Sequence, residues 1–276
     1  MVPGTINKIL WCQAPLKKII TGEAMIRVTV WNEYEHERTI PAIHEVYPEG
    51  IHGALKKILQ KESDMTVICT TLDEPEQGLS EELLQNTDVL IWWSHARQDD
   101  LTDETVERVV RHVHSGMGFI ALHSAHNSRV FRRLMGTPCT LGWKHGDSEK
   151  LYCVAPSHPI AEGVPGCIEL PEEELYAEPF SIPKPDEVVF IGWFSGGAVF
   201  RSGCTFTRGY GKIFYFQPGH EECRVYDIPG ISRIIINAVR WAVPHTRLER
   251  PEDNVNYPNT CSLLGISAAY STSPST

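Results

Sequence analysis

The feature that most constrains this chain is a regular alternation of short apolar runs with amphipathic segments between residues 26 and 135. The runs 26–31, 65–70, 88–93 and 119–122 are β-branched or aromatic and are bounded by polar residues, which predicts buried strands. Helices are expected at 50–61, 80–86, 102–115 and 128–135, where apolar residues recur at helical spacing and Ser80 and Thr102 can serve as N-caps. This alternation favours a doubly wound, mostly parallel α/β sheet with right-handed crossovers.

The pattern changes after Gly136. Prolines interrupt short apolar pieces from about 137 to 186, and we interpret this stretch as an insertion draped over the sheet. Strands are then expected at 188–194, 198–200, 204–208 and 212–216, with a hairpin turn at Gly196–Gly197, before a closing helix at 231–243.

The two ends of the chain differ from its middle. We expect residues 1–24 to be a poorly ordered extension, residues 25–248 to form the folded domain, and the Ser- and Pro-rich stretch 249–276 to be a flexible tail. A net charge of −10 gives no basic footprint for nucleic acid. No apolar run is long enough to span a membrane, and the 8 cysteines contain no C-x-x-C pair, which favours a reduced, cytoplasmic protein.

Histidines follow four of the predicted strands. His36, His95, His123 with His126, and His220 each come within a few residues of a strand end. Because the carboxyl ends of parallel strands share one edge, we expect these imidazoles to face one cleft. By contrast, His112 and His114 are expected on a helix surface, and the same expectation of exposure applies to His44, His52 and His245. His158 is expected to anchor the turn before Pro159.

Acidic and aromatic residues extend the candidate site. Glu221 or Glu222 is expected to orient the imidazole of His220 by accepting its second N–H. One carboxylate of Glu172–Glu174 is expected to turn inward beside Tyr176. The tryptophans at 92, 93, 143 and 193 are expected mainly in the core, although one at the cleft could stack on a sugar ring.

Six short motifs, taken together in this order, resemble the ThuA-like (trehalose utilisation) family of the class I glutamine amidotransferase-like, flavodoxin-like group. The resemblance covers about 26–244. The motifs are Val30-Trp-Asn-Glu33 with His36, Asp88-Val-Leu-Ile-Trp-Trp-Ser-His95, Gly118-Phe-Ile-Ala-Leu-His-Ser124, His158-Pro-Ile160 with Gly163, Glu174-Leu-Tyr176, and Gly209-Tyr-Gly-Lys-Ile-Phe-Tyr-Phe-Gln-Pro-Gly-His220.

The resemblance implies a strand-to-helix elbow that carries a cysteine nucleophile in the wider amidotransferase group. Here His123 occupies the elbow, positions 122–124 contain no cysteine, and Cys139 lies beyond the following helix. Glutamine hydrolysis through a thioester is therefore not expected, because an imidazole cannot replace a thiolate in acyl transfer.

Three chemistries remain open at this stage. In the first, His36, His123 and His220, together with Glu33, bind a divalent metal ion, with zinc favoured. In the second, His123 and His220, supported by Glu221, act as metal-free general acid and base. In the third, Ser124 is a nucleophile with His220 as its base, although the G-x-S-x-G setting is missing.

The expected substrate-binding residues are Glu33, His95, Ser124, His126, Glu174 and Tyr176. No nucleotide cofactor is expected.

The family resemblance implies carbohydrate catabolism, with a trehalose-derived or related keto-disaccharide as substrate. An isomerase, lyase or hydrolase would suit a site rich in histidine. The alternative is a non-catalytic carbohydrate-binding or regulatory module that keeps the scaffold without the chemistry. The expected partner is a small carbohydrate rather than nucleic acid or membrane, and the sequence leaves a homo-oligomer open.

Overall fold

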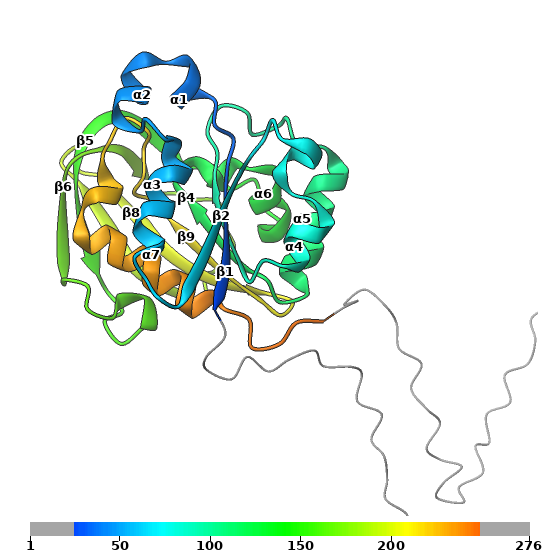
Figure 1. Ribbon diagram of the computed structural model, residues 1–276. Coiled ribbons are helices and arrows are strands. Elements are labelled where there is room, and N and C mark those ends of the chain that lie inside the picture. The colour runs from blue at the N-terminus through cyan, green and yellow to red at the C-terminus, as the bar shows by residue number, and fades with distance from the viewer. Residues whose placement is uncertain (1–24, 249–276) are drawn as a thin grey trace, which may run out of the picture.

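The computed structural model describes residues 25–248 (Figure 1). The extension and the tail expected at 1–24 and 249–276 lie outside the described residues. No helix within the described range is long and apolar enough to cross a membrane.

A nine-stranded sheet with the order β2-β1-β3-β4-β9-β8-β7-β5-β6 forms the centre of the fold. Its first five strands are parallel: β2 (Met65–Thr71), β1 (Ile26–Asn32), β3 (Val89–Trp93), β4 (Gly118–Leu122) and β9 (Gly211–Phe216). The remaining strands, β8 (Val199–Arg208), β7 (Glu187–Phe194), β5 (Gly142–Cys153) and β6 (Cys167–Ala177), are antiparallel to their neighbours. The α/β prediction is confirmed, but the sheet is mixed rather than mostly parallel.

Helices cover both faces of the parallel half (Figure 1). On one face, α3 (Gly50–Leu59) and α7 (Pro229–Ala242) pack against the valines and isoleucines of the strands. On the other face lie α4 (Glu81–Gln85), α5 (Asp103–His114) and α6 (Arg129–Met135). The predicted N-caps Ser80 and Thr102 accept the backbone N–H groups of Leu83 and Thr105, so both predictions are confirmed.

We expected the stretch 137–186 to be draped over the sheet. Instead, it adds two strands to the sheet. Strands β5 and β6 pair with each other, and β5 also pairs with β7. The prolines misled the interpretation because three of them, Pro156, Pro159 and Pro165, lie between the two strands. Pro171 lies within β6, which an edge strand tolerates because its outward N–H groups need no partner.

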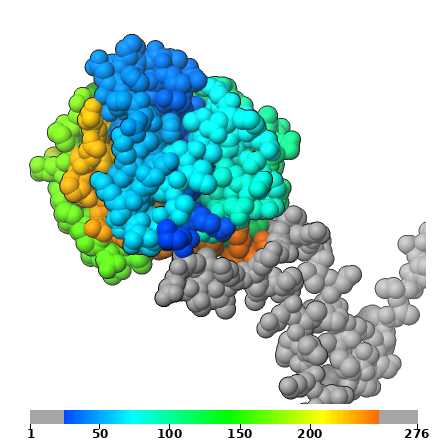
Figure 2. Space-filling model, viewed as in Figure 1, coloured from blue at the N-terminus to red at the C-terminus, as the bar shows by residue number. Residues whose placement is uncertain are grey.

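Two short helices, α1 (His36–Thr39) and α2 (Pro41–Val46), follow β1. They sit above the carboxyl end of β1, and the space-filling view shows them as a blue projection at the top of the molecule (Figure 2). Short 3-10 turns complete the fold, namely η1 (Pro75–Gly78), η2 (His123–Asn127), η3 (Pro159–Ala161) and η4 (Val225–Asp227).

The tryptophans divide between core and surface. Trp92 and Trp93 are fully buried, as expected, and Trp92 stacks on Trp31 with ring centroids 3.9 Å apart. The expectation of burial is wrong for Trp143 and Trp193, whose exposed fractions are 62% and 44%. Trp143 matters for the site, because it stands at the mouth of the cleft described below.

Candidate functional site

The register of the sheet brings four strand ends level with one another. Asn32 of β1 is opposite Trp93 of β3, Trp93 is opposite Leu122 of β4, and Leu122 is opposite Phe216 of β9. The polar residues that follow each strand therefore emerge side by side at one edge. The rings of the histidines after β3, β4 and β9 lie 5.2 to 6.4 Å apart between centroids, at His95, His123 and His220.

His123 sits at the turn that leaves β4, with φ of 51°, a left-handed conformation that is rare for a residue other than glycine. Its Nδ1–H donates to the backbone oxygen of Gln217 at 2.8 Å. Its Nε2 lies 3.0 Å from Oε2 of Glu174 and 3.3 Å from the hydroxyl of Tyr176. The imidazole is fully buried, so these contacts fix its orientation.

Glu174 and His123 form a buried ion pair. Burial lowers the pKa of His123, but the hydrogen bond that it donates to Glu174 and the charges of Glu173 and Glu174 outweigh burial and raise the pKa above 6.5. Burial opposes ionisation of Glu174, yet the hydrogen bond and charge of His123 lower its pKa to about 2. Each partner therefore favours the charged form of the other, imidazolium for His123 and carboxylate for Glu174.

The tautomer of His95 follows from its neighbour. The hydroxyl of Ser124 donates its single hydrogen to the backbone oxygen of Ser94 at 2.7 Å. His95 Nδ1, 3.2 Å from the same hydroxyl oxygen, must therefore be the donor of that contact. Its Nε2 keeps a free lone pair, and burial together with the charge of His123 lowers the pKa of His95 to about 4.

His220 has the opposite tautomer. Its Nδ1 accepts the backbone N–H of Glu222 at 3.3 Å, so in the neutral ring the hydrogen is on Nε2. Burial and the charge of His123 lower its pKa to about 3. Gly219 precedes it with φ of 143°, and a Cβ there would lie 2.3 Å from the hydroxyl of Tyr226. The chain can reach this position only with glycine.

We expected Glu221 or Glu222 to orient His220 through its carboxylate. Instead, the carboxylate of Glu221 binds His36. Its Oε1 lies 2.5 Å from Nδ1 of His36, and its Oε2 lies 3.5 Å from Nδ1 of His95. Burial raises the pKa of Glu221, and the hydrogen bond with His36 opposes that rise. Glu221 thus holds His36, whereas its Oε2 lies near His95 without a hydrogen-bond partner among residues 25–248.

Two predicted substrate-binding residues, Glu33 and His126, form hydrogen bonds with the protein backbone. Both carboxylate oxygens of Glu33 accept backbone N–H groups, from Ala96 and Arg97, and Glu33 is only 1% exposed. His126 donates through Nδ1 to the backbone oxygen of Cys139 at 2.7 Å, and burial lowers its pKa to about 4. Glu33 shapes the loop after β3, whereas His126 still faces the cleft.

Three overlapping groups within residues 25–248 have ligand atoms within 4.8 Å of one another. They are His95 with His123 and His220, His36 with His95 and Glu221, and His145 with Glu174 and His220. The predicted metal set therefore needs correction, since His95 rather than His36 joins His123 and His220. The Nδ1–H of His95 is already bound to oxygen, which leaves its Nε2 as the ligand atom, an arrangement typical of metal-binding histidines. In His123 both ring nitrogens are hydrogen-bonded, Nδ1 to Gln217 and Nε2 to Glu174.

His145 is a site residue that sequence reasoning missed. It lies in β5, and its Nδ1 is 3.6 Å from Oε1 of Glu174. It does not follow a strand end, so the spacing argument could not find it. In the acidic run, Glu173 and Glu174 both turn inward rather than one, and Glu173 accepts the backbone N–H groups of Gly219 and His220.

The other histidines lie away from the site. His112 is buried, against expectation, because Nε2 contacts Glu81 and Nδ1 contacts Arg247. His158 caps η3 by accepting the N–H of Ile160, which confirms its structural role. His44 is exposed, as expected.

The site opens into a cleft of about 290 Å³. Its floor is polar, with His95, Ser124 and Glu174, and its wall is aromatic, with Tyr176 and Trp143. The hydroxyl of Ser124 contacts His95 rather than His220, so the predicted Ser124–His220 couple is not assembled.

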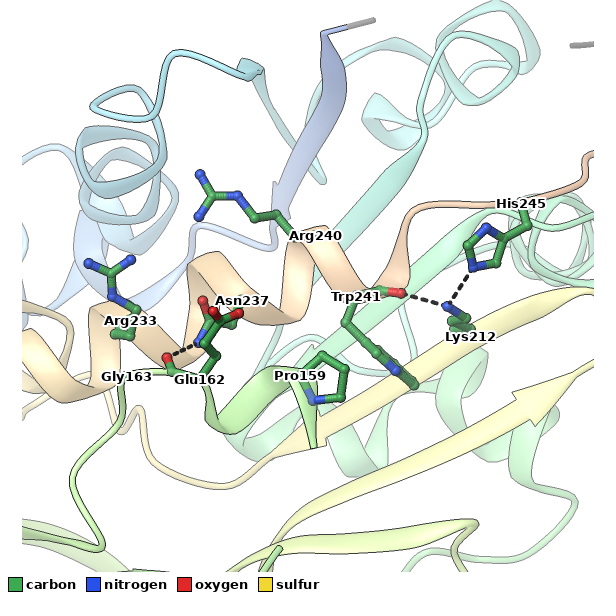
Figure 3. Close-up of a pocket in the computed structure, with 9 residues that line it drawn as sticks. All are labelled: Pro159, Glu162, Gly163, Lys212, Arg233, Asn237, Arg240, Trp241 and His245. Carbon is green, nitrogen blue, oxygen red and sulfur yellow. Dashed lines mark hydrogen bonds between the residues drawn. The ribbon is translucent and has the colours of Figure 1, made fainter. Parts of the chain in front are cut away.

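A larger cavity of about 610 Å³ lies at the opposite edge, between α7 and the start of β9 (Figure 3). Two of its cations are already bound to protein groups. Lys212 donates to the backbone oxygen of Trp241, and Arg240 pairs with Glu62 and Asp64. None of the predicted site residues lines it. We place the candidate site in the smaller cleft because, within residues 25–248, the groups of imidazoles and carboxylates that could share a ligand converge there.

Comparisons with known proteins agree with this architecture. A ThuA-like protein from Parabacteroides merdae has a TM-score of 0.60 at 17% identity, covering 80% of this chain and 90% of that chain. A ThuA-like protein from Bacteroides uniformis has a TM-score of 0.58 at 16% identity, covering 83% and 95%. A cytoplasmic protein from Salmonella typhimurium has a TM-score of 0.54 at 12% identity, covering 79% and 100%. These similarities concern the fold.

No curated protein matches the chain. The model of the ThuA family, described as trehalose utilisation, matches residues 27–242. The chain therefore belongs to the ThuA family.

Proposed function

We propose that this protein is an enzyme of carbohydrate catabolism that acts on a trehalose-derived or related keto-disaccharide. The observation that carries the proposal is the convergence of His95, His123 and His220, with opposite tautomers at His95 and His220, beside one cleft that His95 lines. Family membership supports a carbohydrate-related role. The aromatic wall and polar floor suit a sugar, whose rings offer both apolar and hydroxyl faces.

His95 and His220 form a base and a donor at neutral pH. His95 presents an unprotonated Nε2 that can take the proton next to a sugar carbonyl. His220 presents Nε2–H, which can donate to the carbonyl oxygen as it gains negative charge. The expectation that His123 is the base is revised, because its Nε2 is bound by Glu174.

The paired His123 supplies fixed positive charge below the reacting atoms. An imidazolium held by Glu174 stabilises an enolate without giving up its own proton. Proton removal next to a carbonyl is the first step shared by isomerases and many lyases, which places these two classes ahead of a hydrolase.

A divalent metal ion, with zinc favoured, fits the same residues. His95 would bind it through its free Nε2, His123 would do so after releasing its Nε2 proton and the contact with Glu174, and His220 would do so after moving its proton to Nδ1. A bound ion would polarise the sugar carbonyl or activate a water molecule. No nucleotide cofactor is part of this proposal.

The proposal is tested by turnover of 3-keto-trehalose, with metal content measured on the same preparations by elemental analysis. We expect turnover by the native chain and its loss in His123→Ala and His220→Ala. Unchanged turnover in both variants would rule the proposal out. Stoichiometric zinc that disappears in His123→Ala would add the metal to the mechanism.

A second candidate is a non-catalytic carbohydrate-binding module. The full burial of His123 and its engagement by Glu174 favour this reading, since both give the imidazole a structural role. Thermal shift with trehalose and keto-disaccharides separates the two. Stabilisation by sugar that is indifferent to all three histidines, without turnover, would favour the module.

A further inference from the structure

A second buried carboxyl group lies behind the cleft, outside the mechanism described above. Glu149 of β5 is 1% exposed and faces Gly192 of the neighbouring strand. A Cβ on Gly192 would lie 2.1 Å from Oε1 of Glu149 and 2.5 Å from Oγ of Ser202. Only a glycine fits at this position of β7, because the carboxyl group of Glu149 and the hydroxyl of Ser202 fill the space that a side chain would need.

The hydroxyl of Ser202 lies between two side-chain oxygens. Oγ of Ser202 is 3.0 Å from Oε1 of Glu149 and 3.4 Å from Oε1 of Gln217. The amide of Gln217 is oriented, since its Nε2 donates to the backbone oxygen of Glu174 at 3.1 Å. Its Oε1 must then face Ser202 as an acceptor, so one hydroxyl hydrogen stands between two acceptor oxygens.

A proton on Glu149 would make hydrogen bonds of both contacts of Ser202, the one with Glu149 and the one with Gln217. If Glu149 carries a hydrogen on Oε1, it donates to Ser202, and Ser202 donates in turn to Gln217. The other oxygen, Oε2 of Glu149, has no hydrogen-bond partner among residues 25–248. A neutral carbonyl oxygen tolerates that position far better than a carboxylate oxygen does.

The chain of hydrogen bonds ends at the histidine centre. Gln217 is fully buried, and its backbone oxygen accepts Nδ1–H of His123. Its side chain holds the backbone of Glu174, the partner of Nε2 of His123. One glutamine thus accepts the hydrogen bond from Nδ1 of His123 and holds the residue that contacts Nε2.

We propose that Glu149 is a neutral carboxylic acid whose proton completes a hydrogen-bond chain through Ser202 and Gln217 and thereby orients His123 and Glu174. Glu149 is a positioning residue, because it touches no substrate. Burial and the nearby charge of Glu173 raise the pKa of Glu149 well above its usual value, in agreement with the hydrogen count. The catalytic consequence rests on the proposed function, whereas the protonation and the orientation do not.

The protonation is tested by infrared difference spectroscopy of the full chain at pH 8. The native protein minus Glu149→Gln should show the carbonyl band of a protonated carboxylic acid. A difference spectrum with only carboxylate bands would overturn the proposal.

The orientation is tested without substrate, by NMR of the ring nitrogens in protein labelled with ¹⁵N-histidine. Glu149→Gln keeps a donor toward Ser202 and should retain the Nδ1–H signal of His123. Glu149→Leu has a similar volume and no donor, and it should shift or broaden that signal. Glu169→Leu is the control, since Glu169 has a side chain 75% exposed on β6 and should change nothing.

Ser202→Ala is the second variant, in case Glu149→Leu does not fold. It cuts the chain in the middle, so the acid band of Glu149 should persist while the His123 signal changes. An unchanged His123 signal in every folded variant would overturn the proposal. A native protein with the band and the signal but without turnover of keto-sugars would refute the proposed function alone.

Discussion

Three neighbouring imidazoles at one edge of the sheet differ in protonation because their hydrogen-bond partners differ. Ser124 fixes the hydrogen of His95 on Nδ1, the backbone of Glu222 fixes that of His220 on Nε2, and Glu174 keeps His123 charged. The residue types alone would suggest three equivalent bases. The hydrogen-bond partners make one base, one donor and one cation.

The base can be removed while its supporting contact is kept. In His95→Asn, the amide nitrogen can still donate to Ser124, but nothing replaces the free Nε2. We expect kcat for the keto-sugar to fall about 100-fold or more, the usual contribution of a general base. His44→Asn, at an exposed position, is the matched control and should keep native kinetics. Native kcat in His95→Asn would assign the base elsewhere.

The buried pair of His123 and Glu174 should give a distinctive pH dependence in metal-free protein. The pKa of His123 is raised, so its contribution to stability is complete below about 6.5 and is lost as pH rises through the folded value. The pKa of Glu174 is lowered to about 2, so its contribution is complete above about 4.5 and is lost as pH falls toward 2.

Glu174→Gln should therefore cost most between pH 4.5 and 6.5, by about 3 kcal/mol for a broken buried pair. Urea unfolding of both proteins across pH 3 to 9, in the presence of a chelator, measures the difference. A difference that is flat across this range would mean that the pair is not ionised.

Trp143 should contribute stacking energy to sugar binding. It lines the cleft and is 62% exposed, and its ring meets the ring of His145 at 5.2 Å. Trp143→Ala should weaken disaccharide binding by about 1 kcal/mol, or about fivefold in Kd, as measured by calorimetry. Trp193→Ala removes a similarly exposed ring that does not line the cleft and should bind normally. Equal losses in both variants would argue against stacking.

At the level of elements, local patterns predicted the parallel half of the sheet well. Caps such as Ser80, helical spacing in α5 and the β-branched run of β1 depend on neighbours in sequence, which a sequence displays directly. Strands β5 and β6 were missed because their order in the sheet depends on distant pairing, and Pro171 disguises an edge strand. His145 was missed for the same reason, since its partner Glu174 comes from the strand beside it.

Gly192 in β7 should be required by the buried carboxyl group of β5. Gly192→Ala places a methyl group against Glu149 and Ser202 and should lower the free energy of unfolding by about 2 kcal/mol through overpacking. Gly166→Ala is the control, because a Cβ there meets nothing within 4 Å and the residue has no left-handed backbone. Urea titrations report both values, and equal stability of the two variants would contradict the close contact.

For the molecule as a whole, the sheet explains why residues far apart in sequence share one site. Parallel pairing of β1, β3, β4 and β9 aligns their carboxyl ends, and the antiparallel strands β5 and β6 close the cleft from the other side. The meeting of His95, His123 and His220 was predictable from strand ends. The backbone groups of Gln217 and Glu222, which fix the tautomers of His123 and His220, were not predictable, because nothing in a sequence marks a backbone contact.

The central claim is that this edge of the sheet removes a proton next to the carbonyl of a keto-sugar. The most direct measurement is exchange of that hydrogen for deuterium in D₂O, followed by NMR of 3-keto-trehalose. We expect the native protein to catalyse the exchange and His95→Asn to lose it, with His44→Asn unaffected. Absence of exchange with the native protein, or undiminished exchange with His95→Asn, would contradict the account.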